Sequence, residues 1–307
     1  MKRIIAASVV LTGVMVVLGL FGPGIYRSAV VAYHYRQIFN KPYSPDEHYV
    51  AISKYPNEAY ELAQRKLRSS QEWPQVSIGI LGDIGDDRSI ALISSTLERG
   101  IRPFDCANNL RKIGTQQARD ALSRALHHRN AEVRRVAYPA YIRIVAQDTD
   151  TAVNACRDGL RDESIAVRLQ VLHRLKELPE VREPLKGILI GIFESESQGR
   201  LAEVVTETLA RDCYPPAVDA IMSVVEKRLL EGFPRGARDH LRFLGEGCGN
   251  SLIPRLLKLA RKCPQENVWP IVETISDMAG RGYGHGADFE SLTEAEVWWS
   301  QSSGTEK

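Results

Sequence analysis

Residues 81–97 read LGDIGDDRSIALISSTL, and residues 110–126 read LRKIGTQQARDALSRAL. When the two stretches are aligned, a leucine, an isoleucine, a glycine and a final leucine each recur 29 positions later. Self-similarity at a fixed period of about 20 to 50 residues is typical of repeat proteins, in which each repeat packs on its neighbours. The fold is therefore best sought as a stack of repeats.

An apolar position near the end of a helix, followed by a small or turn residue, recurs along the body of the chain. Apolar residues between these positions fall three and four apart, with breaks at Gly, Pro, Asn and Asp, which indicates helices and not strands. Each period accommodates two helices of about 12 residues, so we predict an all-α fold, an α-solenoid of stacked helical hairpins over residues 43–280. Pro139 is expected to kink or split its helix. The recurring positions, 29 to 35 residues apart, are Leu81, Leu110, Ile142, Leu175, Leu209, Leu244 and Ile275.

Residues 110–141, LRKIGTQQARDALSRALHHRNAEVRRVAYPAY, resemble the HEAT repeat in its bacterial, phycobilisome-lyase-like form. Val133, Arg134 and Ala137 supply the Val-Arg-x-x-Ala motif of that repeat, and Arg168 follows Arg134 by 34 residues in a second copy. The resemblance covers roughly residues 74–280 and is best over these two repeats. It implies a solenoid in which Arg134 and Arg168 are structural residues that tie a turn to the next repeat.

The N-terminus has the pattern of a membrane anchor. Lys2 and Arg3 precede an uncharged run of 19 residues, 4–22. As a helix this run would be roughly 28 Å long, close to the hydrocarbon thickness of a bilayer. We therefore predict one transmembrane helix, a signal anchor within residues 1–25, followed by a juxtamembrane helix over residues 26–42, whose Tyr26, Tyr33 and Tyr35 suit either the membrane interface or packing on the body. A cleaved signal peptide and a buried helix are the alternatives.

Basic residues on both sides of the predicted span leave its orientation open. We favour a cytoplasmic N-terminus and an extracytoplasmic body, the usual layout of a single-pass signal anchor. At the other end, residues 281–307 are predicted to form a glycine linker and a terminal capping helix that begins with a capping box of Thr293 and Glu296. Trp298 and Trp299 lie in this helix and would cover the end of the solenoid, or else dock on a partner or a membrane.

No catalytic or metal-binding motif is present. The sequence holds no Cys-x-x-Cys, no His-Glu-x-x-His, no Gly-x-Ser-x-Gly and no phosphate loop of the Walker type. Cys213 and Cys248 occupy equivalent positions of neighbouring repeats, which stack about 10 Å apart, beyond the roughly 7 Å Cα separation that a disulfide allows. We therefore expect buried free thiols there, and no catalytic residue, cofactor or metal.

Charge is the most informative feature for binding. The chain has 40 Lys and Arg against 38 Asp and Glu, a balance that disfavours nucleic acid as a partner. Residues 227–262 are locally basic, however, with nine basic against three acidic residues. Two helix faces, each formed by residues three to four apart, make up the candidate partner surface: Arg235, Arg238 and Arg242 on one, Arg255, Lys258 and Lys262 on the other.

These features favour a non-enzymatic, membrane-anchored HEAT-repeat scaffold whose basic surface binds a protein partner. Two other functions stay open. One is an enzyme of the HEAT-like lyase or cofactor-maturation type, because relatives of this repeat include bilin lyases and some DNA glycosylases. The other is a basic-faced module that binds anionic lipid. Solvated outer helix faces would also explain the basic residues.

Overall fold

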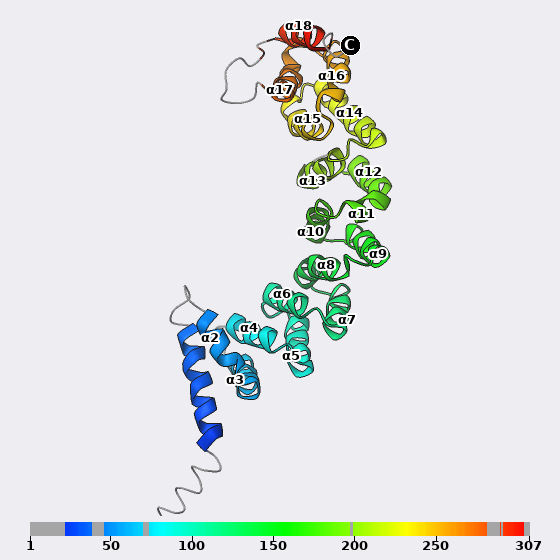
Figure 1. Cartoon of the computed structure of the whole chain (residues 1–307). Coiled ribbons are helices and arrows are strands. Elements are labelled where there is room, and N and C mark those ends of the chain that lie inside the picture. Colours follow the sequence, from blue (N-terminus) through cyan, green and yellow to red (C-terminus); the bar gives the residue numbers. More distant parts are fainter. Residues whose placement is uncertain are drawn as a thin grey trace, which may run out of the picture. The chain divides into compact units, whose positions relative to one another are not determined.

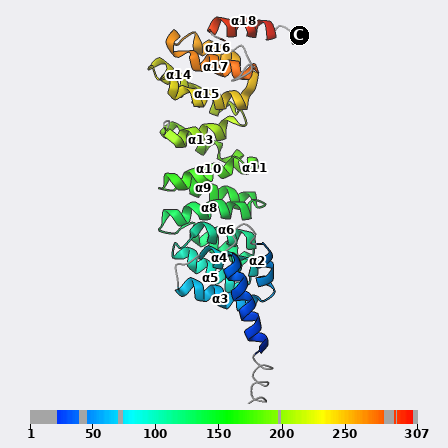
Figure 2. The same ribbon diagram turned by 90° about the vertical axis from the view of Figure 1, so that its left-hand side faces the viewer.

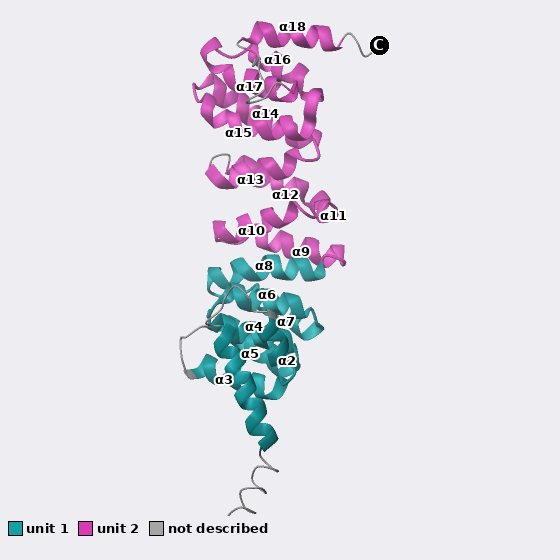
Figure 3. Cartoon of the chain, turned by 60° about the vertical axis from the view of Figure 1, so that its left-hand side comes forward, with its two compact units in different colours: residues 1–145 teal, residues 146–307 magenta. Residues whose placement is uncertain are grey.

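The computed structural model describes residues 22–38, 46–69, 74–196, 199–280, 289 and 291–303. Within these ranges every regular element is a helix and there is no strand. The chain divides into two compact units, residues 1–145 and 146–307 (Figure 3). The prediction of an all-α fold is confirmed.

Unit 1 is a series of helices that pack as successive hairpins (Figure 1). One row consists of α4, α6 and α8, each in contact with the next, and α5 and α7 pack together beside it. The helix of residues 22–38 joins this unit through its buried Val31, Tyr35 and Ile38, and the Tyr35 hydroxyl forms a 2.9 Å hydrogen bond with the Ser77 hydroxyl. The further helices are α2 (Asp46–Ser53), α3 (Pro56–Ser69), α4 (Pro74–Ile84), α5 (Asp87–Glu98), α6 (Pro103–Ile113), α7 (Gln116–Ala125) and α8 (Ala131–Val145).

Unit 2 repeats the same arrangement. Figure 1 shows α10, α13, α15 and α17 along one side of the unit and α9, α12, α14 and α16 along the other, and Figure 2 shows these helices lying across the direction of stacking. The α helices are α9 (Thr149–Leu160), α10 (Ile165–Leu175), α11 (Pro179–Arg182), α12 (Lys186–Ser195), α13 (Gly199–Ala210), α14 (Pro215–Leu230), α15 (Pro234–Cys248), α16 (Ile253–Ala260), α17 (Trp269–Met278) and α18 (Leu292–Ser303). Three short 3-10 turns, η1 (Glu183–Leu185), η2 (Gly249–Leu252) and η3 (Gln265–Asn267), join some of them.

The recurring apolar positions form the centre of each stack. Leu81, Leu110 and Ile142 lie in α4, α6 and α8 of unit 1, and their side chains are completely buried. Leu175, Leu209, Leu244 and Ile275 take the same place in α10, α13, α15 and α17 of unit 2, and none is more than 1% exposed. Burial at every repeat is what a helical hairpin needs, because its apolar face is covered only by the next hairpin. The arrangement within each unit is consistent with an α-solenoid.

None of the described helices combines the length and the apolar character needed to cross a membrane. The predicted anchor, residues 1–25, lies outside the described residues except for its last four, and it stays a prediction. The three tyrosines of the predicted juxtamembrane helix differ in exposure. Tyr35 is buried against α4, whereas Tyr26 and Tyr33 are 65% and 58% exposed.

The prediction of free thiols at Cys213 and Cys248 is wrong, because the two residues form a disulfide with a Cα–Cα separation of 4.9 Å. Cys213 lies in the turn after α13, with a φ of +44°, and Cys248 ends α15. A Cβ at the adjacent Gly247 would lie 1.8 Å from the Ala210 carbonyl oxygen. Stacked helices lie about 10 Å apart where side chains stand between them. Gly247 has no side chain, so α15 approaches the end of α13 more closely at this point.

Pro139 does not split its helix, since α8 is continuous from Ala131 to Val145, and a kink at this residue stays a prediction. The predicted capping box of α18 is wrong. At the start of α18 the Ser291 hydroxyl accepts a hydrogen bond from the Glu294 N–H at 3.4 Å. Thr293 is already inside α18, which begins at Leu292, and Glu296 accepts a hydrogen bond at 2.9 Å from Arg261. The helix packs against α16 and α17.

Candidate partner surface

The six basic residues predicted to meet a partner lie on two different rows of unit 2. Arg235, Arg238 and Arg242 belong to α15, which packs between α13 and α17. Arg255 and Lys258 lie on α16, with Lys262 just beyond its end, and this helix belongs with α14 to the other row (Figure 1). The structure therefore brings together each group of three but not the six.

Three of the six join neighbouring repeats. Arg238 donates two hydrogen bonds to Glu273, and its Nε lies 2.8 Å from Oε2. Arg255 and Lys262 reach back to Asp219 and Glu226 of α14 at 2.6 and 2.8 Å. Each bond joins residues 35 or 36 positions apart, about one repeat, so these charges pair with acidic residues of a neighbouring repeat.

The other three are more available to a partner. Arg242 is about half exposed, and its acidic neighbours on the same helix, Asp239 and Glu246, lie 3.7 and 3.9 Å away. Arg235 and Lys258 form no ion pair with any described residue and are exposed. The free positive charge of this region is thus smaller than the sequence predicts.

Exposed apolar side chains lie at the end of α14, just before α15 and at the start of α17, and the sequence analysis did not identify them. Leu230, Phe233 and Trp269 are 51%, 63% and 39% exposed. Gly232, with a φ of +82°, ends α14 and turns the chain, so that Phe233 precedes the first residue of α15, Pro234. This turn places the Phe233 ring outside the stack.

The starts of α15 and α17 are adjacent. The Asn267 side-chain amide donates a 2.8 Å hydrogen bond to the Leu229 carbonyl, which connects the turn before α17 to the end of α14. The Arg238 guanidinium lies 5.8 Å from the centre of the Trp269 ring. We name this group of residues the α15 edge: Leu230, Phe233, Arg235, Arg238 and Trp269.

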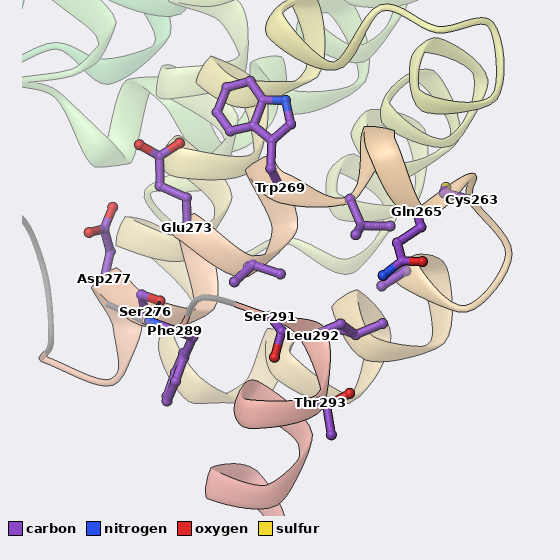
Figure 4. Close-up of a pocket in the computed structure, with 13 residues that line it drawn as sticks. Cys263, Gln265, Trp269, Glu273, Ser276, Asp277, Phe289, Ser291, Leu292 and Thr293 are labelled. Carbon is purple, nitrogen blue, oxygen red and sulfur yellow. Dashed lines mark hydrogen bonds between the residues drawn. The ribbon is translucent and has the colours of Figure 1, made fainter. Parts of the chain in front are cut away.

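A pocket of about 630 Å³ lies between α16, α17 and the start of α18 (Figure 4). Figure 4 shows Glu273 and Asp277 projecting from α17 on one side and Cys263 and Gln265 on the other. Burial raises the pKa of the Cys263 thiol, with a further contribution from Glu226, so the thiol stays protonated near neutral pH. Polar side chains share the walls with apolar ones, and the Cys263 thiol is not activated as a nucleophile.

Arg134 and Arg168, predicted as structural, have different partners. Arg134 donates to the carbonyls of His128 and Arg129 at 2.8 and 3.2 Å, in the turn before its own helix. Arg168 pairs with Glu196, 28 residues later. Arg182 combines both kinds of contact: it binds both carboxylate oxygens of Asp212, at 3.0 and 2.6 Å, and reaches the carbonyls that end α10.

The described part of the chain contains no group of three His, Cys, Asp or Glu residues that could hold a metal ion. Its two fully buried free thiols, Cys106 and Cys156, have pKa values raised to about 12, chiefly by burial. Thiols in that state are protonated at neutral pH and are poor nucleophiles.

The chain matches no protein-family model and no curated protein. Its resemblance to HEAT repeats thus rests on the repeat signature of residues 110–141 and its second copy around Arg168.

Proposed function

We propose that this protein is a non-enzymatic, HEAT-like scaffold, held at a membrane by residues 1–25, that binds an acidic protein partner through the α15 edge. The observation that supports this function best is the composition of that edge. The exposed Trp269 ring lies against Arg238, and the exposed Phe233 lines a cavity together with Arg235. Aromatic residues and arginine are the residue types enriched in the energetically dominant centres of protein interfaces.

The charge of the edge supports an acidic partner. Arg235 forms no ion pair within the described residues, and Arg238 keeps 44% of its side chain exposed although it pairs with Glu273. A carboxylate of the partner can therefore meet Arg235 without first breaking an internal bond. Such contacts mainly set the rate and the specificity of association, while the apolar side chains supply most of the affinity.

The disulfide supports an extracytoplasmic body. Disulfides persist in oxidising compartments and are rare in reducing cytoplasm, and Cys213–Cys248 lies in the same unit as the α15 edge. The uncharged run of residues 4–22, with Lys2 and Arg3 before it, supports a single-pass membrane anchor. In this proposal the partner lies outside the cytoplasm.

Photo-crosslinking in the native membrane tests the proposal. A photo-reactive phenylalanine analogue would replace Phe233, 63% exposed on the α15 edge, or Phe104, 66% exposed near the start of α6, as a matched control. We expect one discrete protein adduct from position 233 and none of that mass from position 104. Arg235→Glu should reduce the yield of this adduct, because it places a like charge opposite an acidic partner.

Three outcomes would contradict the proposal: adducts with lipid alone, the same adducts from both positions, or no adduct from position 233. Lipid adducts would favour the membrane-binding alternative.

A further inference from the structure

The helix of residues 22–38, blue in Figure 1, is attached to unit 1 by one of its faces. Val31, Tyr35 and Ile38 follow one another at spacings of four and three residues, so they lie on the same side of the helix. All three are at most 8% exposed, and the Tyr35 hydroxyl bonds to Ser77 of α4. This side of the helix is therefore part of the core of unit 1.

The opposite side of the same helix is open and carries large apolar side chains. Ile25, Tyr26 and Tyr33 are 61%, 65% and 58% exposed, and Ala29 and Arg36 are exposed as well. Successive members of the series Ile25, Ala29, Tyr33 and Arg36 are three or four positions apart, and Tyr26 precedes Ala29 by three. The five residues therefore share one side of the helix, which we name the outer face.

The outer face carries no negative charge. Residues 22–38 contain no Asp or Glu, and their Lys and Arg residues are Arg27 and Arg36. Arg27 lies 3.9 Å from Glu58, whereas Arg36, on the outer face, forms no ion pair with a described residue. Tyrosine and arginine suit the boundary between a membrane and water, because each joins an apolar body to a polar end that reaches the headgroups.

The chain that precedes this helix indicates what covers the outer face. The uncharged run of residues 4–22, which is the proposed anchor, ends where the helix begins. Gly22, Pro23 and Gly24 stand at this junction. Proline is favoured in the first turn of a helix but interrupts a helix that continues through it, because it lacks an N–H and clashes with the preceding turn. The junction therefore allows the chain to change direction between the anchor and the helix.

We infer that the outer face lies on the surface of the phospholipid bilayer, and that the helix of residues 22–38 thereby holds unit 1 against the membrane. The inference rests on the membrane anchor of the proposed function. The large apolar side chains of the outer face would enter the boundary between headgroups and acyl chains, the depth typical of amphipathic helices. Arg36 would extend to the lipid phosphates.

The position of Tyr33 distinguishes a helix that lies on the bilayer from one that stands upright on it. In an upright helix that continues the anchor, Tyr33 would be roughly 16 Å beyond residue 22, at a rise of about 1.5 Å per residue. The headgroup layer on each side of a bilayer is only about 5 to 7 Å thick. Contact of Tyr33 with lipid therefore requires the helix to lie along the surface.

Photo-crosslinking of the full-length protein in vesicles of phosphatidylcholine and phosphatidylglycerol tests the inference. A photo-reactive phenylalanine analogue would replace Tyr33. The matched control is the same analogue at Phe104, which is 66% exposed near the start of α6 in the same unit. We expect lipid adducts from position 33 and few or none from position 104. Mass spectrometry of the peptides that contain each position measures the yield.

A second pair of variants tests the contribution of the outer face to this contact. With the analogue at position 33, Tyr26→Glu should lower the yield of lipid adduct by about tenfold, because a large apolar contact with the membrane is lost and a charge takes its place. Phe104→Glu makes the same kind of change at an equally exposed aromatic residue and should leave the yield unchanged. Equal effects of the two variants would contradict the inference.

An alkaline wash of the vesicles separates failure of this inference from failure of the anchor. The inference alone is overturned if the protein resists the wash but position 33 gives no lipid adduct or no more than position 104. It is also overturned if position 33 yields an adduct with a second copy of the chain, because another protein then covers the outer face. If the wash removes the protein, the proposed anchor is overturned and the inference with it.

Discussion

Arg182 shows how a single side chain connects two repeats. Its guanidinium is 5% exposed, binds both carboxylate oxygens of Asp212, and also reaches the carbonyls of Leu175 and Lys176. Burial opposes ionisation of Asp212, but Arg182 and then Lys186 hold the pKa of this carboxyl below its ordinary value. The buried guanidinium therefore depends on one carboxylate for its neutralisation.

Asp212→Asn should lower the free energy of unfolding by about 3 kcal/mol, because it leaves the charge of Arg182 buried without a counter-charge. Asp83→Asn is a close control. Asp83 also pairs with a basic residue about one repeat away and is equally exposed, at 28%, but its partner Lys112 is 61% exposed. This control should lose less than about 1 kcal/mol. Urea denaturation followed by circular dichroism measures both, and equal losses would show that burial of the cation is unimportant.

At the scale of elements, the packing of α15 against α13 depends on a residue without a side chain. Gly247 lies so close to the Ala210 carbonyl that a Cβ would be 1.8 Å from its oxygen, which is backbone and has little freedom to move. Gly191 in α12 is also helical, but a Cβ there would meet nothing within 4 Å. Replacing either glycine by alanine gains the ordinary preference of helices for alanine, but only the replacement of Gly247 also produces a steric clash. A comparison of the two variants therefore isolates the effect of the close approach.

Gly247→Ala should destabilise unit 2 by more than about 2 kcal/mol, because the two helix ends must move apart. Gly191→Ala should be neutral or stabilising by up to about 1 kcal/mol. Thermal unfolding of both variants, repeated after reduction of the Cys213–Cys248 disulfide, provides the measurement. If Gly247→Ala is destabilising only in the oxidised protein, its effect acts through the disulfide and not through helix contact.

The local sequence predicts which segments are helices and which of their residues are buried. It does not predict which side chains of different helices pair with one another. The apolar repeat alone predicts that Leu110 and Leu244 are buried, as they are, because burial at three- and four-residue spacing is a property of each helix. By contrast, Arg238 pairs with Glu273. This pairing depends on how α15 and α17 stack, which the local sequence does not specify. The sequence pattern does not predict the exposure of Phe233 and Trp269 either, since an aromatic residue at a helix start gives no periodic signal.

At the scale of the whole molecule, some of the 40 basic and 38 acidic residues pair with one another between neighbouring repeats. Ion pairs between residues about one repeat apart recur in both units, from Lys112–Asp83 in unit 1 to Lys176–Glu207 and Arg261–Glu296 in unit 2. Charges used in this way are partly neutralised within the chain, even where the side chain stays exposed, as Arg238 does. The local basic excess of residues 227–262 therefore overstates the positive charge that this region offers to a partner.

The disulfide and the N-terminal run together make a prediction about the whole chain. Five cysteines are present, of which Cys106, Cys156 and Cys263 are free in the structure. If residues 1–25 direct the body to an oxidising compartment, the protein isolated from cells, acid-quenched and alkylated in denaturant should take up alkyl groups at those three cysteines only. A variant lacking residues 2–25 should remain in the reducing cytoplasm and be alkylated at all five.

Intact mass spectrometry measures the difference, and the denaturing step makes the result independent of whether the shortened chain folds. Five alkylated cysteines in the full-length protein would place the body in a reducing compartment and reverse the proposed orientation.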